Sequence, residues 1–457
     1  MVEEFRILSP TGILGYGFPV ESFNAGLACQ PDLFACDAGS TDPGPYYLGS
    51  GKCFTTRSAV KRDLSMLLTA ACKMGKPLVI GSAGGSGAKP HLDRDLEVLA
   101  EIAEEQELTF KLAIISADFD KDFLLKEFRN GHLTRLGAAP ELAEKDIIDS
   151  SNIVAQMGIE PIIEAINDGA QVIVCGRCYD PAVFAAPAIR LGFDKALAIH
   201  LGKILECAAI AADPGSGADC MMGYLGDDYF RVEPLNPARK CTPLSVSAHT
   251  LYEKSNPYLL PGPGGVLDLS DCQFLADSDR CVRVKGSKYH SSQIYTVKLE
   301  AARKLGFRTI SICGNRDSIF ISEVDEILLA VKQQVKQNLP PEMDFHLDFI
   351  VYGKNGVMGN FEPIKEITSH EVGIVIDAVA DTQELANTVC SIARSTLLHY
   401  GYPGRLATAG NLAFPFSPSD VEVGAVYSFS IYHLLETNQP VELFKREYKT
   451  IVKGREI

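Results

Sequence analysis

The first half of the chain alternates short apolar runs with longer amphipathic segments. The apolar runs end directly at polar or turn residues, which is typical of parallel strands buried on both faces. These runs are residues 33–36, 78–80, 111–115 and 172–175. The segments at 58–73, 93–105 and 146–168 carry apolar residues at helical spacing. Strands alternating with helices predict an α/β domain, a mostly parallel sheet with helices on both faces.

The pattern changes in the second half. Residues 281–285 and 293–299 alternate apolar with polar positions, as half-buried strands do. Further strands are expected at 308–313, 346–352, 372–379 and 425–432, and long helices at 322–337 and 382–400. This order predicts an α+β domain with a more antiparallel sheet.

Two domains are also expected from length, because one core stops growing at roughly 250–300 residues and the chain has 457. The segment 235–265 is rich in Pro, Gly and Ser. We therefore place the boundary there, with an α/β domain at 1–240 that carries most site loops and an α+β domain at 241–457.

Composition narrows the class of protein. A formal net charge of −15 disfavours nucleic acid and anionic membranes as partners. The 13 scattered cysteines are typical of free thiols in a reducing compartment. The acidic start of the chain does not resemble a signal peptide, and no uncharged apolar run reaches the ~20 residues that span a bilayer. We expect a cytoplasmic protein, and a homo-oligomer is compatible with its size.

The first candidate loop follows the strand at 33–36. Asp37 can act as an acid or base, and Ser40 and Thr41 can bind substrate, because ligands of such sheets bind beyond the carboxyl ends of strands. Asp37, Asp42 and Asp180 also offer the oxygen ligands that Mg²⁺ takes, so the need for a metal stays open. The alternative is a turn whose side chains cap the backbone.

The second candidate loop is glycine-rich and follows the strand at 78–80. Ser82, Gly84, Gly85 and Ser86 can bring backbone N–H groups close to a carboxylate or phosphate at a helix N-terminus. The run is neither a Walker A motif nor G-x-G-x-x-G, so it does not specify a nucleotide. A flexible connection is the alternative.

The third candidate loop follows the strand at 172–175. Arg177 is placed to bind a carboxylate bidentately, and Asp180 to orient it or transfer a proton. Cys175 and Cys178 have C-x-x-C spacing, but two incidental thiols explain them more simply.

Two further segments carry candidates. His200, Lys203 and Glu206 lie three residues apart, so a helix brings them to one face. There the Lys203–Glu206 pair can supply a general base and a neighbour that shifts its pKa, and His200 can act as an acid. An ordinary exposed ion pair is the alternative there. Tyr252 and Glu253 can add a hydrogen-bonding wall to a site, or serve only in packing.

Together these segments resemble the acyclic terpene utilisation (AtuA) family. The matching residues are Ser82–Gly85, Gly176-Arg177 with Asp180, His200–Cys207, and Thr250–Glu253 with Pro257 and Tyr258. The segments at 7–12 and 409–415 resemble one subgroup of it, which lacks the small ferredoxin-fold-like domain that other members carry at the C-terminus. Ile457 follows without an obvious copy of that domain, so the resemblance implies a separate small ferredoxin-fold-like partner protein.

The candidates favour an enzyme, a lyase or hydro-lyase acting on a small carboxylate or its CoA thioester. Arg177 and the glycine loop would hold carboxylate oxygens, Asp37 or Glu206 would remove a proton, and Asp180 or His200 would assist the leaving group. Two alternatives remain open. One is a non-catalytic subunit that binds a metabolite or partner, and the other is a CoA- or nucleotide-dependent transferase.

Overall fold

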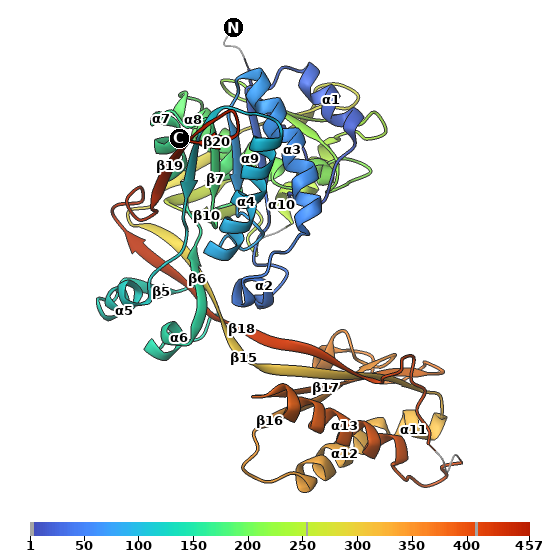
Figure 1. Ribbon diagram of the computed structural model, residues 1–457. Coiled ribbons are helices and arrows are strands. Elements are labelled where there is room, and N and C mark those ends of the chain that lie inside the picture. The colour runs from blue at the N-terminus through green and yellow to red at the C-terminus, as the bar shows by residue number, and fades with distance from the viewer. Residues whose placement is uncertain (1–3, 253–254, 407–409) are drawn as a thin grey trace. The chain divides into compact units, whose positions relative to one another are not determined.

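The structure is a computed structural model that describes residues 4–252, 255–406 and 410–457. The chain divides into two compact units (Figure 1). Unit 1 contains the chain up to Arg303 together with Phe429–Ile457, and unit 2 is Lys304–Ser428. Unit 2 is thus an insertion within unit 1, and the boundary expected near residue 240 falls inside unit 1.

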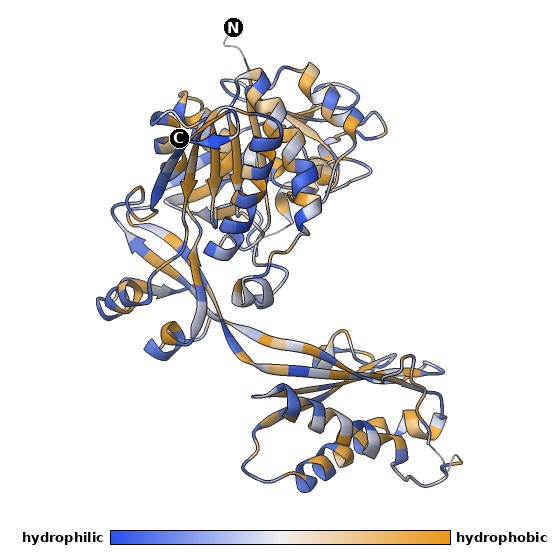
Figure 2. Cartoon of the chain, viewed as in Figure 1, coloured by the Kyte–Doolittle hydropathy of each residue, from blue (hydrophilic) through white to orange (hydrophobic). Residues whose placement is uncertain are grey.

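A large mixed sheet forms the centre of unit 1. Its parallel part has the order β1-β2-β3-β7-β4. These strands are β1 (Phe5–Ser9), β2 (Leu33–Asp37), β3 (Leu78–Gly81), β7 (Val172–Cys175) and β4 (Phe110–Ile115). The four strands expected from the apolar runs are confirmed, and Figure 2 shows the middle of this sheet in hydrophobic colours.

Antiparallel strands extend the sheet at both edges. On the β1 side follow β8 (Met221–Leu225), β9 (Phe230–Pro234), β13 (Val282–Lys285) and β12 (Gln273–Ala276). On the β4 side follow β19 (Arg446–Val452) and β20 (Arg455–Glu456). The last strands of the chain therefore complete the sheet that the first strand begins.

Alternate residues of the parallel strands pack into two cores. Ile7, Ala35 and Ile173 belong to one core with α7 (Glu160–Asn167), α8 (Ala182–Arg190) and α9 (Lys195–Leu205). Leu8, Cys36 and Val174 belong to the other with α3 (Arg57–Met74) and α4 (Lys89–Glu105). The prediction of helices on both faces is confirmed, because strands apolar at every position need cover on each side.

The remaining elements of unit 1 lie around this sheet. A three-stranded sheet consists of β10 (Leu259–Gly262), β11 (Gly265–Asp268) and β14 (Lys288–Ser291). The other elements are α1 (Val20–Ala28), α2 (Pro45–Ser50), α5 (Lys121–Arg129), β5 (Leu133–Arg135), α6 (Glu144–Ile148), β6 (Ser150–Ala155), η1 (Ala208–Ala211) and α10 (Pro243–Leu251). Within the described residues, none of the helices combines the length and the apolar character needed to cross a bilayer.

The helix expected over 146–168 is wrong in its middle. Residues 150–155 form β6, which pairs antiparallel with β15 (Tyr295–Asn315), so that Val154 lies opposite Glu300. Helix α6 precedes this strand and α7 follows it. The apolar residues Ile153 and Val154 satisfy a helical period equally well, but a long-range strand partner decides their conformation.

Unit 2 has the element order β-α-β-β-α-β. After β15 come, in chain order, α11 (Ser318–Ser322), α12 (Val324–Asn338), β16 (Phe345–Tyr352), η2 (Gly359–Phe361), β17 (Val372–Ala380), α13 (Gln383–His399) and β18 (Asp420–Thr437). The sheet order β16-β17-β15-β18 is the split β-α-β arrangement of ferredoxin-like domains. Helices α12 and α13 share one apolar core with this sheet. The predicted α+β region with an antiparallel sheet is confirmed.

In unit 1, Gly87 gives a direct test of how closely the glycine loop packs on the backbone of Arg177. Its φ is +68°, and an added Cβ would lie 2.2 Å from the backbone nitrogen of Arg177. Gly87→Ala should lower the free energy of unfolding by about 3–5 kcal/mol, because backbone strain and overpacking each cost about 1–3 kcal/mol. Urea unfolding followed by circular dichroism measures the loss.

Gly169→Ala is the matched control. Gly169 has a φ of +84° but no atom within 4 Å of an added Cβ, so only the backbone strain applies. We expect this variant to lose about 1 kcal/mol. Equal losses in the two variants would contradict close packing of the glycine loop on Arg177.

Candidate active site

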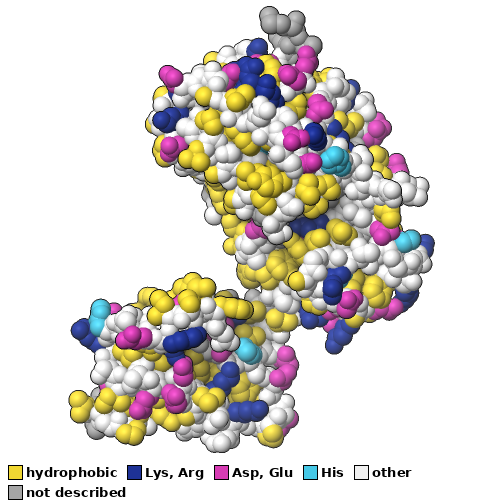
Figure 3. All heavy atoms as spheres, turned by 180° about the vertical axis from the view of Figure 1, so that it is seen from behind, with side chains coloured by type: hydrophobic (Ala, Val, Ile, Leu, Met, Phe, Trp, Pro, Cys, Tyr) yellow, Lys and Arg dark blue, Asp and Glu magenta, His cyan; other side chains and the backbone are white. Residues whose placement is uncertain are grey.

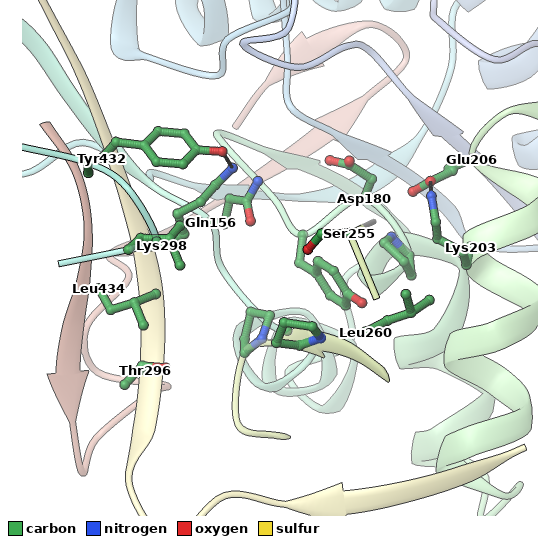
Figure 4. A pocket seen from close by; sticks show the side chains of 18 of the residues that line it. Gln156, Asp180, Lys203, Glu206, Ser255, Leu260, Thr296, Lys298, Tyr432 and Leu434 are labelled. Atoms are coloured by element: carbon green, nitrogen blue, oxygen red, sulfur yellow. Dashed lines mark hydrogen bonds and ion pairs between the residues drawn. The ribbon is translucent and has the colours of Figure 1, made fainter. Parts of the chain in front are cut away.

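A cavity of about 600 Å³ opens in unit 1 beyond the carboxyl end of β7 (Figure 4). The turn after β7 contributes Tyr179, Asp180 and Pro181, and α9 with its C-cap contributes Lys203 and Glu206. The opposite wall comes from β15 and β18, with Thr296, Lys298, Tyr432 and Leu434. Loop 136–139 and the strand end 260–263 close the sides. Segments far apart in the sequence thus share one cavity.

Lys203 and Glu206 form an ion pair at one end of the cavity. The Lys203 Nζ lies 2.6 Å from the Glu206 Oε1, and both side chains are buried. Burial alone would lower the pKa of Lys203, but the Glu206 carboxylate raises it above its ordinary value. The lysine therefore stays charged, and it provides a fixed positive charge beside a carboxylate that faces the cavity.

Asp180 lies beside this pair and is held by Arg177. The Arg177 Nη1 donates to the Asp180 Oδ1 at 2.9 Å. The side chain of Asp180 is 26% exposed, whereas that of Arg177 is 2% exposed. The arginine thus fixes a carboxylate that a ligand can reach.

Glu300 is the buried partner of Arg177. Its Oε2 accepts from the Arg177 Nε at 2.8 Å, and its Oε1 lies 2.8 Å from the Lys298 Nζ. Thr41 donates its hydroxyl to the same Oε1 at 2.8 Å. Burial alone would raise the pKa of Glu300, but Arg177 and Lys298 lower it to about 2. One fully buried carboxylate thus organises two cations.

Lys298 carries this network to the far end of the cavity. Its Nζ donates to the Tyr432 hydroxyl at 3.2 Å and lies 4.7 Å from the centre of the Tyr432 ring. Figure 4 shows Lys298, Tyr432 and Gln156 at one end, and Asp180, Lys203 and Glu206 at the other. A ligand that fills the cavity meets a charged or polar group at each end.

Comparison with known proteins identifies a family. The sequence pattern of the acyclic terpene utilisation family protein AtuA matches residues 57–216 and 236–421. The chain belongs to the AtuA family. Membership suggests a role in acyclic terpene utilisation, which is a catabolic process. Comparisons with curated proteins and with solved structures found no match.

The match to the AtuA family includes both ends of the cavity. Asp180, Lys203 and Glu206 lie in the first matched segment, and Lys298 lies in the second. Of the catalytic and substrate-binding residues expected from the sequence, these first three line the cavity. The structure therefore brings together the third loop and the helix at 200–206.

Arg177 lies beneath the cavity. Its Nε and Nη1 bind Glu300, Asp180, the Ser82 hydroxyl at 3.0 Å and the Cys178 carbonyl at 3.0 Å. These contacts give it a positioning role that the sequence does not reveal. Carboxylate binding by Arg177, as expected from the sequence, would have to compete with them.

The glycine loop is folded against the Arg177 turn. The N–H groups of Gly84, Gly85 and Gly87 donate to the Asp95 carboxylate, the Ser82 carbonyl and the Ala83 carbonyl, respectively. Ser82 and Ser86 are buried. The N–H of Lys89, in the first turn of α4, donates to the Asp118 carboxylate. Because protein acceptors use these donors, the loop positions Arg177 and presents few N–H groups to a phosphate.

Asp37 does not line the cavity, but the charges of Asp180 and Arg177 act on its carboxyl. Its carboxyl is buried, and the Oδ2 accepts from the Gly39 N–H at 3.3 Å. Burial, and then the negative charge of Asp180, raise the pKa of Asp37 well above its usual range. The nearby Asp37 therefore favours its protonated form. Ser40 accepts from the Asp42 N–H, as a turn residue does.

His200 is a core residue that does not line the cavity. Its ring nitrogens contact the hydroxyls of Ser287 at 2.8 Å and Thr250 at 3.3 Å. Burial, with Lys203 nearby, lowers the pKa of His200 to about 3, so the ring is neutral. Tyr252 is 64% exposed, and Glu253 lies outside the described residues.

The carboxylates considered for magnesium do not fit that ion. Asp37 favours its protonated form, Asp180 is paired with Arg177, and Asp42 is exposed. Within the described residues, no group of three or more His, Cys, Asp or Glu side chains is placed to hold a metal.

Sequence reasoning missed Glu300, Lys298 and Tyr432. The signal was weak, because Lys298 and Glu300 look like polar positions of an ordinary half-buried strand. In the structure both neighbours of Glu300 are fully buried, and Glu300 itself has no exposed surface. A charged residue within the run Leu299–Ala302 was the one indication of a buried ion pair.

Glu300 makes the stability of the protein depend on pH. We expect Glu300→Gln to lose about 3–5 kcal/mol at pH 7, since it leaves buried cations without their counter-charge. The pKa of Glu300 is depressed in the folded state, from 4.5 to about 2. Its contribution is therefore present above pH 4.5 and is lost as the pH falls toward 2. Urea unfolding at pH 3 to 8 should show the gap between wild type and variant closing in acid. A constant gap would contradict this role.

Asp37→Asn should change the stability of the protein in the opposite direction to Glu300→Gln. The raised pKa of Asp37 means that its protonated form stabilises the folded state, and this contribution is lost as the pH rises through that pKa. Asparagine keeps the neutral state at every pH. The variant should therefore gain stability relative to wild type as the pH rises above 3.8. A loss that grows with pH would show that Asp37 is needed as an anion.

Proposed function

We propose that this chain is a catabolic enzyme, a lyase or hydro-lyase that acts on a carboxylate or its CoA thioester with an apolar carbon chain. The observation that carries the proposal is the Lys203–Glu206 pair, buried at the end of a cavity that Asp180 also lines. Two carboxylates with different cationic partners, facing one space, are suited to acid–base chemistry.

The shape of the cavity supports a substrate with an apolar chain. Its volume of about 600 Å³ lies within the usual range of small-molecule sites. Leu260, Pro261, Pro263 and Leu434 also line it and give it an apolar surface. A chain of several carbons would bury its surface here, and its polar group would reach Lys298 or Tyr432.

The proposed reaction is an elimination. The Glu206 carboxylate removes a proton from the carbon next to the carbonyl, and the electrons of that C–H bond form a C=C bond. The C–O bond at the neighbouring carbon breaks, and the hydroxyl leaves as water with a proton that the partly exposed Asp180 passes on from solvent. Glu206 afterwards releases its proton to solvent. Lys203 stabilises negative charge that develops on the carbonyl oxygen. This assignment uses three of the residues expected from the sequence, in a cavity that holds all three.

A transferase that binds phosphate on the glycine loop has less support, because carbonyl and carboxylate oxygens of the protein already accept hydrogen bonds from the N–H groups of that loop. We also propose a cytoplasmic location and a separate small ferredoxin-fold-like partner protein. The cysteines are all free thiols, which supports a reducing compartment.

The test is turnover by the purified protein, alone and with its candidate partner, on branched and linear 3-hydroxyacyl-CoA thioesters and the free hydroxy acids. Glu206→Gln and Asp180→Asn should each lower kcat by about 10²–10⁴, the usual worth of a general acid or base. KM should change little, since neither residue is proposed to bind the substrate. Appearance of the conjugated C=C bond in ultraviolet absorbance measures the rate.

Glu105→Gln is the control, because Glu105 is an exposed helix residue paired with Lys61. It should retain wild-type kcat. Equal activity of wild type, Glu206→Gln and Asp180→Asn would overturn the assignment. Thermal stabilisation of the wild type by one of these compounds without any turnover would favour the non-catalytic subunit instead.

A further inference from the structure

A second cavity, in unit 2, has the character of an anion site. It has a volume of about 500 Å³ and lies where β15 ends and β17 begins. These strands pair antiparallel, with Asn315 opposite Val372. The residues just after β15 and just before β17 are therefore neighbours, which brings Arg316 and His370 to one opening.

The charges of this cavity differ from those of the chain. Arg316, Lys365 and His370 line it, and none of its lining residues is acidic. The whole chain carries 58 acidic against 43 basic residues, and Figure 3 shows both signs interspersed on the surface. Several acids are next to lining residues in sequence, but they do not line the cavity themselves. Among them, Glu366 and Glu371 are exposed. Asp317 already accepts from the Tyr402 hydroxyl at 2.7 Å and the Ile319 N–H at 2.9 Å. The residues that line the cavity are therefore basic or uncharged.

The donors of this cavity are available to a ligand. Arg316 and His370 make no hydrogen bond or ion pair within the described residues. Lys365 donates one of its three N–H bonds, to the Glu362 carbonyl at 2.6 Å. A guanidinium in solution keeps a fork of donors that matches an oxyanion.

The chemistry favours a phosphate monoester. A phosphate dianion offers three strong acceptor oxygens, which three basic side chains can meet together. Ile321 and Ile367 line the same cavity and give an organic group an apolar surface. The volume exceeds what inorganic phosphate alone requires. We propose that this cavity of unit 2 binds a small molecule through its phosphate monoester group, with Arg316 and Lys365 as the principal anion ligands.

The test is calorimetric titration of the full chain with phenyl phosphate, inorganic phosphate and benzyl alcohol at physiological salt. Phenyl phosphate should bind saturably at one site per chain, inorganic phosphate more weakly, and benzyl alcohol not at all. Arg316→Ala and Lys365→Ala should each weaken phenyl phosphate binding by about tenfold or more, the worth of one charge-assisted hydrogen bond. Both residues are exposed, so the fold should persist, and thermal melting checks it.

Lys332→Ala is the matched control, because it removes one positive charge from unit 2 outside the cavity, at a half-exposed lysine 3.7 Å from Asp348. It should leave binding unchanged, since Lys332 does not line the cavity and salt screens the charge of an exposed side chain. An equal loss in Lys332→Ala, the absence of saturable binding, or equal binding of benzyl alcohol would overturn the proposal.

Glu206→Gln separates this proposal from the function proposed for unit 1. Phenyl phosphate binding that survives in Glu206→Gln supports a separate site, whatever that variant does to turnover. Binding that is lost in Glu206→Gln and kept in Arg316→Ala would place the ligand in the cavity of unit 1, and the proposal would fail.

Discussion

The site depends on keeping the guanidinium of Arg177 charged in the interior of unit 1. An unpaired charge there would cost several kcal/mol, so the surrounding chain must supply a counter-charge and acceptors. Glu300 supplies the charge from β15, and Ser82, Asp180 and the Cys178 carbonyl supply further acceptors. The geometry of the cavity follows from meeting these demands at once.

Several features of the chain then have a common cause. The glycine loop must approach the Arg177 backbone more closely than a Cβ allows, which explains Gly87 and its positive φ. Strand β15 must place Glu300 in the interior, and this also brings Lys298, two residues earlier, to the wall of the cavity. Asp180 is fixed on one side of the arginine and Lys298 on the other side of Glu300. Two buried residues, Arg177 and Glu300, thus hold the polar groups that face the cavity.

The parallel sheet was predictable from the sequence because its strands are apolar at every position, and only a sheet covered on both faces buries such runs. Asp180, Lys203 and Glu206 were predictable for a related reason, since they follow a buried strand or share one helical face. Glu300 was not, because its role depends on the pairing of β15 with β6, in which Glu300 lies opposite Val154, 146 positions earlier in the chain. Only the fold supplies such a long-range pairing. The misassigned helix over β6 and the missed glutamate are therefore one error. The roles of the glycine loop were also hidden, because a sequence shows which backbone is flexible and not which acceptors its N–H groups meet.

The balance of charge in the two cavities argues for different ligands. In unit 1, Lys203 and Lys298 are matched by Asp180 and Glu206 among the lining residues, so the cavity itself is close to neutral. A polyanion such as a tricarboxylate would bring more charge than this lining compensates. A single carboxylate on an apolar chain would not, nor would the acyl part of a CoA thioester whose phosphates stay outside the cavity. The cavity of unit 2 has basic residues and no acidic one in its lining, and so it compensates a dianion. Net charge alone would have argued against any anionic ligand for a chain at −15; the local arrangement of a few side chains decides otherwise.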